Sequence, residues 1–138
     1  MKNYAILNTN VFLYDVLSDC RICSGIYDLC KKGKLKLIYN DAIIDDYKDC
    51  FSNLTPDEKE KYNTSIERLK SFGVKLEISE ILNLKNDSES TIYKIVPSSA
   101  IYKDKSPKAN NGLTIVGIDE IIELLWKKET LRSLLFKT

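Results

Sequence analysis

The chain has 138 residues with 21 basic and 20 acidic side chains, and it contains no histidine. The absence of imidazole excludes Ser-His-Asp and Cys-His catalysis, histidine-ligated zinc and histidine-ligated haem. A formal net charge of +1 excludes a histone-like polycation, so any nucleic-acid contact would use a local patch. Chemistry is therefore expected from carboxylates, lysine, tyrosine, cysteine or hydroxyl groups.

Length and composition predict a single domain over residues 1–138, since a domain typically holds about 100–150 residues. No Pro/Gly-rich linker or repeat divides the chain. The amino-terminal apolar run is interrupted by Asn8, Asn10 and Asp15, so we expect neither a signal peptide nor a membrane span. We expect a cytoplasmic location.

The four cysteines allow two disulfides, a four-thiolate zinc site or reduced side chains. Cys20, Cys23 and Cys30 recur along one helical stripe, and Cys50 stands apart. A structural zinc site normally has a second Cys-x-x-Cys pair, which is missing here. The spacing favours reduced thiols in a reducing compartment.

The first forty residues read as strand, helix, strand. Residues 4–7 are a short apolar run typical of a buried strand. A helical pattern follows over residues 11–32, with a break near residues 18–19, and Gly33 ends it. Residues 36–39 predict the second strand.

The middle of the chain carries two helix start signals. Asn40 or Asp41 caps a helix with apolar residues on one face. Residues 55–58 have the order of a capping box with proline at the first helical position, which predicts a helix over residues 56–72. Residues 74–78 alternate as a strand, and the segment after them is assigned to neither state.

The last third repeats the alternation. Residues 88–96 read as a helix ended by proline, and residues 100–102 as a strand followed by a helical turn. Residues 113–116 predict the last strand, and residues 118–126 form the clearest amphipathic helix. Strands alternating with helices predict an α/β layer fold with a mainly parallel sheet.

Polar residues, mostly acidic, gather where the predicted strands end. In a parallel sheet the strand-to-helix turns converge at the carboxyl ends of the strands, where ligands bind. Carboxylates without histidine or cysteine suit Mg²⁺ or Mn²⁺, although each acid alone could merely favour a helix dipole. Asp45 and Asp49 lie beside Asp46, and spacing does not choose among the three. The candidates are Asn8, Thr9, Asn10, Asp46, Glu89 and Asp104.

Three motifs carry a resemblance to PIN-domain ribonucleases. Residues 6–13, Ile-Leu-Asn-Thr-Asn-Val-Phe-Leu, resemble the opening strand of that family, which usually reads Asp, Thr or Ser, then Asn. Residues 43–47 resemble the second-acid motif, which selects Asp46. Residues 87–117 are similar to a PIN branch reading Gly-Glu, short helix, strand, Asp-Asp, helix, Gly-Leu, strand, Gly.

The resemblance implies a three-layer α/β/α Rossmann-like domain that cleaves RNA with Mg²⁺ or Mn²⁺, often as the VapC-type toxin of a toxin–antitoxin pair. It implies an RNA substrate, an antitoxin partner and a homodimer, and no membrane partner. The implied catalytic and metal-binding positions are Asn8, Asp46, Glu89 and Asp104, with Thr9 and Asn10 supporting the first turn.

Three positions depart from the family pattern: Asn8 replaces the first acid, Ser88 replaces glycine, and Lys105 replaces the second aspartate of the late pair. Asparagine offers a carbonyl oxygen without charge, so metal affinity and turnover should fall. An engineered change that silences a toxic nuclease and natural degeneration both account for Asn8. The alternative function is a degenerate PIN-like module that binds RNA or protein without catalysis.

Lysines form two clusters. Those at 103, 105 and 108 surround Asp104, where phosphate contacts would position RNA. Those at 31, 32, 34 and 36 are a second cluster that could equally be a solvated face. Four tyrosines lie on apolar stripes and are predicted to be core rather than base-stacking residues: Tyr4, Tyr27, Tyr39 and Tyr47.

Overall fold

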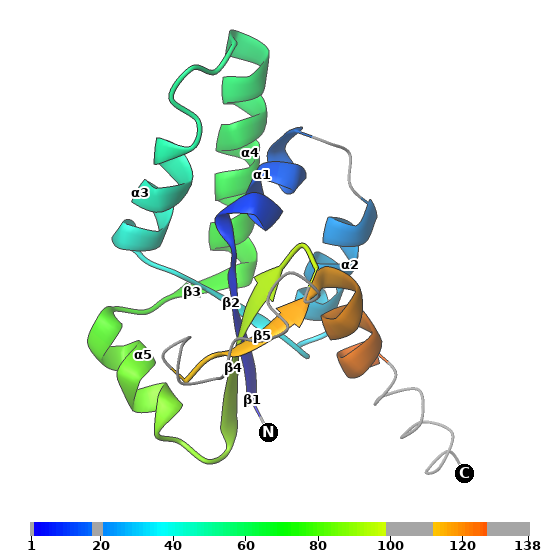
Figure 1. Ribbon diagram of the computed structural model, residues 1–138, viewed down its shortest axis with the longest axis vertical. Coiled ribbons are helices and arrows are strands. Elements are labelled where there is room, and N and C mark those ends of the chain that lie inside the picture. The colour runs from blue at the N-terminus through cyan, green and yellow to red at the C-terminus, as the bar shows by residue number, and fades with distance from the viewer. Residues whose placement is uncertain (1, 18–20, 99–111, 127–138) are drawn as a thin grey trace.

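The computed structural model describes residues 2–17, 21–98 and 112–126. Its strands form one sheet in the order β3-β2-β1-β4-β5, and each neighbouring pair is parallel (Figure 1). The predicted α/β fold with a mainly parallel sheet is confirmed. The strands are β1 (Lys2–Leu7), β2 (Lys36–Tyr39), β3 (Gly73–Lys75), β4 (Ser90–Val96) and β5 (Thr114–Gly117).

Helices lie on both faces of the sheet, which is the three-layer arrangement. The main core packs α1, α2 and α4 against one face, together with the helix over residues 118–126. Helix α5 lies against the other face, and α3 lies beyond the carboxyl end of β1 (Figure 1). In the described ranges, no helix is both long and apolar enough to cross a membrane. The named helices are α1 (Thr9–Leu17), α2 (Arg21–Lys31), α3 (Asp41–Asp49), α4 (Pro56–Phe72) and α5 (Ile78–Lys85).

The predicted helix boundaries match local capping chemistry. Asn40 caps α3 by accepting a hydrogen bond from the Ile43 N–H at 2.9 Å. Thr55 and Glu58 form the reciprocal capping box that begins α4. Gly33 has a φ of +73°, the left-handed conformation that ends α2 without a Cβ clash. These signals were readable from sequence because they involve neighbours only.

Glycine is required where α4 passes directly into β3. A Cβ on Gly73 would lie 2.6 Å from the Leu69 carbonyl oxygen and 2.9 Å from that of Leu37. Both atoms belong to backbone, which cannot move aside cheaply. The close approach lets β3 pair with β2 immediately after the helix ends.

The prediction of a helix over residues 88–96 is wrong. Residues 90–96 form β4, which pairs with β1 on one side and β5 on the other. Ile92, Ile95 and Val96 have helical spacing, but a strand buried on both faces is also nearly continuously apolar. The β-branched and aromatic residues of this segment suit the strand, and the flanking strands decided the outcome.

Other boundaries shift less. The strand expected over residues 74–78 is confirmed only as the shorter β3, and α5 occupies most of the segment left unassigned. The first helical stretch is divided as expected, into α1 and α2. The strand predicted at residues 100–102 and the turn through 109 lie outside the described residues.

A buried polar cluster joins α1, α2 and α4. The Asp15 carboxylate, only 5% exposed, lies 3.6 Å from Arg68 Nη1 and accepts a 3.3 Å hydrogen bond from the Tyr27 hydroxyl. Ser65 of α4 also hydrogen-bonds to it. Burial raises the pKa of Asp15, and the Arg68 charge opposes that rise. The three helices are thus tied together at one carboxyl group.

This raised pKa predicts a pH dependence of stability. An acid whose pKa is raised in the folded state stabilises that state below its unfolded pKa, about 3.9, and loses the contribution as pH rises through the folded pKa. The free energy of unfolding should therefore fall, relative to an Asp15→Asn variant, as pH rises from about 3 to about 7. Urea titrations of both proteins across this range measure the difference. A difference that changes in the opposite direction would show that the Arg68 ion pair outweighs burial.

Candidate functional site

Asn8 links the end of β1 to the start of α1. Its backbone N–H donates to the Ile95 carbonyl at 2.8 Å, and its carbonyl accepts from the Phe12 N–H at 3.1 Å. Its side-chain Oδ1 accepts a 2.9 Å hydrogen bond from the Asn10 N–H. Thr9 is half-buried in the first turn, and Asn10 is exposed. The side chain therefore caps α1, a task that asparagine and aspartate both perform.

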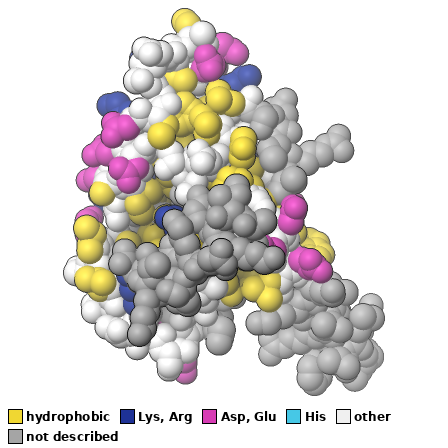
Figure 2. Space-filling model, viewed as in Figure 1, with side chains coloured by type: hydrophobic (Ala, Val, Ile, Leu, Met, Phe, Trp, Pro, Cys, Tyr) yellow, Lys and Arg dark blue, Asp and Glu magenta, His cyan; other side chains and the backbone are white. Residues whose placement is uncertain are grey.

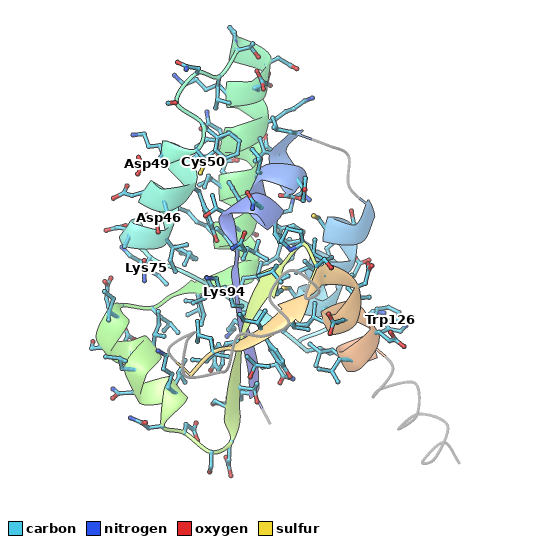
Figure 3. The ribbon with its side chains drawn as sticks, in the orientation of Figure 1. Asp46, Asp49, Cys50, Lys75, Lys94 and Trp126 are labelled. Atoms are coloured by element: carbon cyan, nitrogen blue, oxygen red, sulfur yellow. The ribbon has the colours of Figure 1, made fainter. Side chains whose placement is uncertain are left out.

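Asp46 lies on α3, which its neighbour Tyr47 holds against the end of β1. The buried Tyr47 hydroxyl donates a 2.6 Å hydrogen bond to the Leu7 carbonyl, the residue before Asn8. The Tyr47 ring stacks on Phe12 with centroids 4.3 Å apart. Asp46 itself is exposed (Figure 3). Asn8 and the helix carrying Asp46 thus meet at the carboxyl edge of the sheet.

Exposed acids gather on α3 over this edge (Figure 2). Asp41 pairs with Lys75 of β3 at 3.5 Å. The pKa of Tyr47 is raised, mainly by burial and secondarily by the Asp46 charge. The exposed acids of α3 are Asp41, Asp45, Asp46 and Asp49.

The structure does not bring Glu89 to this edge. Glu89 precedes β4, and its carbonyl accepts a 2.9 Å hydrogen bond from the Lys2 N–H at the amino end of β1. Six residues of β1 separate that end from Asn8, which is about 20 Å at 3.3 Å per residue. The Glu89 prediction followed from reading 88–96 as a helix. Once that segment is a strand, its first acid falls on the opposite side of the sheet.

The remaining predicted site residues, Lys103, Asp104, Lys105 and Lys108, lie outside the described residues. Within residues 2–17, 21–98 and 112–126, no three His, Cys, Asp or Glu side chains group closely enough to hold a metal ion. Of the predicted positions, the described part of the chain brings together Asn8, Thr9, Asn10 and the helix that carries Asp46.

Sequence reasoning missed Lys94, which lies near the same edge (Figure 3). Its register partners are Ile6 on β1 and Ile115 on β5, so it is one cation in an aliphatic row on the α5 face. It makes no ion pair with a described residue. Asn8 is two residues beyond Ile6, which puts its Cα about 8 Å from that of Lys94. The alternation of Ile92, Lys94 and Val96 was the available signal.

Glu77 and Glu80 were also missed, in the segment left unassigned. They begin α5, just beyond the carboxyl end of β3, where they form a reciprocal capping box. The Glu77 N–H donates to Glu80 Oε1 at 3.2 Å. The spacing Glu-x-x-Glu was the signal for this helix start.

Neither a protein-family model nor a curated protein matches this chain. The likeness to PIN domains therefore rests on its own motifs, and the observed fold is compatible with it.

The Tyr47 hydroxyl offers a test of how α3 is positioned. Tyr47→Phe keeps the ring stack but leaves the buried Leu7 carbonyl without this donor, which should lower the free energy of unfolding by about 1–2 kcal/mol. Tyr62→Phe is the matched control, because the Tyr62 ring contacts Phe12 and its hydroxyl makes no hydrogen bond to a described residue. Chemical denaturation measures both. Equal effects from the two variants would contradict the assigned role.

Proposed function

We propose that this chain is a PIN-type domain that binds Mg²⁺ or Mn²⁺ at the carboxyl edge and cleaves RNA, with activity reduced by Asn8. The observation that carries the proposal is the Tyr47–Leu7 hydrogen bond, which holds the helix bearing Asp46 against the strand that ends at Asn8. The parallel sheet with β1 at its centre supports it, because ligands bind beyond the carboxyl ends of such strands.

The donors at this edge are oxygen atoms, which suit a hard cation. Mg²⁺ keeps several waters and needs only one or two protein carboxylates, so Asp46 together with Asp104 is an adequate ligand set. Such an ion, when bound, lowers the pKa of water and stabilises charge on a phosphodiester. Asn8 would contribute a neutral oxygen, with its amide orientation set by the hydrogen bond to Asn10. Lys103, Lys105 and Lys108 are the proposed phosphate contacts.

By the same resemblance, we propose the cellular role of a toxin in a toxin–antitoxin pair. Its partners would be the RNA substrate, an antitoxin protein and a second copy of the chain, in the cytoplasm.

A second candidate is a degenerate PIN-like module that binds RNA without cutting it. Asn8 and Lys94 favour it, because they make this part of the edge less negative than an aspartate at position 8 would. A lysine ammonium can contact a phosphate directly, without an intervening metal. The two candidates differ in what a restored acid at position 8 would do.

Restoring the acid tests the nuclease. We expect Asn8→Asp to raise Mn²⁺-dependent cleavage of total RNA by about tenfold or more, and a chelator to abolish it. On that background, Asp46→Asn should remove the cleavage. Asp49→Asn is the matched control, since Asp49 is an equally exposed acid of α3 and is not a proposed ligand.

Two results would contradict the nuclease. One is the absence of cleavage by Asn8→Asp, and the other is equal cleavage by the Asp46→Asn and Asp49→Asn double variants. RNA that binds without being cut, with affinity lowered by Lys94→Gln, would support the second candidate instead.

A further inference from the structure

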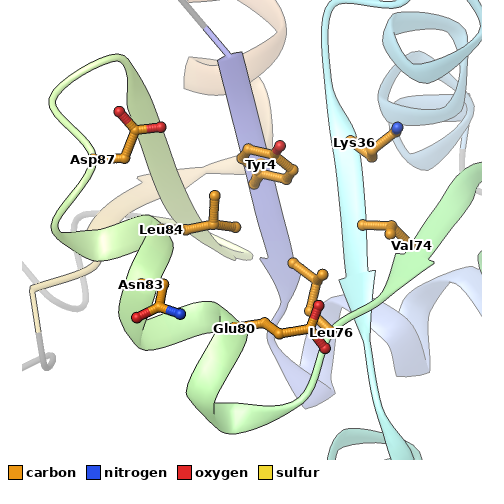
Figure 4. A pocket seen from close by; sticks show the side chains of 8 residues that line it. All are labelled: Tyr4, Lys36, Val74, Leu76, Glu80, Asn83, Leu84 and Asp87. Carbon is orange, nitrogen blue, oxygen red and sulfur yellow. The ribbon is translucent and has the colours of Figure 1, made fainter.

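A hollow of about 440 Å³ lies between α5 and the face of the sheet opposite the main core (Figure 4). Small-molecule sites typically span roughly 300–1,000 Å³. Strands β1, β2 and β3, the β3–α5 connection and α5 supply the walls. The lining residues are Tyr4, Lys36, Val74, Leu76, Glu80, Asn83, Leu84 and Asp87.

The centre of the hollow is apolar and contains an aromatic ring. Tyr4 points to the α5 face because its neighbour Ala5 points into the main core. Tyr4 was predicted to be core, but it is only half-buried, with Leu84 of α5 across from it (Figure 4). Its hydroxyl makes no hydrogen bond to a described residue. An available ring beside aliphatic side chains is a surface on which a flat heterocycle can stack.

The two carboxylates of the hollow already serve the backbone around α5. Glu80 Oε1 accepts from the Glu77 N–H at 3.2 Å. Asp87 accepts from the Glu89 N–H at 3.0 Å and from the Ser90 hydroxyl at 2.9 Å, and these bonds lower the pKa of Asp87. Both acids therefore have a structural task, which is to shape the two ends of α5.

The cation of the hollow has no such partner. Lys36 is the register neighbour of Tyr4, so its stem starts beside the ring. It is exposed and makes no ion pair or hydrogen bond with a described residue. An unpaired ammonium group beside an available ring suits a ligand that is aromatic at one end and anionic at the other.

We propose that this hollow binds a nucleotide, with its base stacked on Tyr4, its phosphate at Lys36 and the Asn83 amide at the edge of the base. Tyr4 and Asn8 are four residues apart on β1, about 13 Å, so this site is separate from the proposed metal site. The inference does not rest on the proposed function. The nucleotide is either free or the end of an RNA strand, and these two sources share the same chemistry.

Calorimetric titration of the full chain tests the site. The probes are adenosine 5′-monophosphate, adenosine, inorganic phosphate and a 5′-phosphorylated triadenylate. We expect the monophosphate to bind at least about tenfold more tightly than adenosine or phosphate, because only it engages both Tyr4 and Lys36. Tighter binding of the triadenylate identifies an RNA end as the ligand, and equal or weaker binding identifies the free nucleotide.

Variants locate the binding. Tyr4→Leu and Lys36→Gln should each weaken binding of the monophosphate about tenfold, and Tyr4→Phe should preserve it because the ring remains. Lys75→Gln is the matched control, a lysine of the same sheet that pairs with Asp41 outside the hollow. Asp46→Asn should also leave binding unchanged, which keeps this test independent of the nuclease.

Three results would overturn the proposal. They are no binding of the monophosphate at millimolar concentration, binding of phosphate as tight as that of the monophosphate, and equal binding by Tyr4→Phe and by Tyr4→Leu. The last comparison holds even if Tyr4→Leu is less stable, provided that circular dichroism shows both proteins folded.

Discussion

The contact of Tyr47 with the end of β1 organises the carboxyl edge of this protein. One side chain stacks on Phe12 of α1 and donates to the Leu7 carbonyl, so it joins α3, α1 and the central strand. The bond is short and its donor is 1% exposed, a setting in which an unmade hydrogen bond is costly. Without it, α3 would have less reason to lie over this edge. The placement of Asp46 therefore depends on its buried neighbour.

The two faces of the sheet have different roles as a result of strand alternation. One face builds the main core under α1, α2 and α4, where Asp15 and Arg68 add a buried polar tie. The other face is covered by α5, among the described elements, and keeps a hollow over Tyr4. Lysines replace aliphatic residues at two points on that face, Lys36 and Lys94. Available cations are thus found on the face with less packing.

The carboxyl edge shows how far residue order predicts a site. Asn8 and Asp46 follow the first two strands, which were read correctly, and the edge holds both. Glu89 failed for one reason, because its segment has the apolar spacing of a helix and the neighbours of a strand. Only pairing with β1 and β5 distinguishes these readings. The same misreading hid Lys94, which faces the sheet surface only in a strand.

The sequence by itself determined the alternation of strands and helices, the caps at Asn40 and Thr55, and the turn at Gly33, because these depend on residues within one turn of each other. Tertiary structure decided the identity of β4, the edge on which Glu89 lies and the exposure of Tyr4, since each depends on segments distant in sequence. An apolar run is compatible with a helix or a central strand until its neighbours are in place. The missing histidines still confine the chemistry to other side chains, and the fold decides which of these meet.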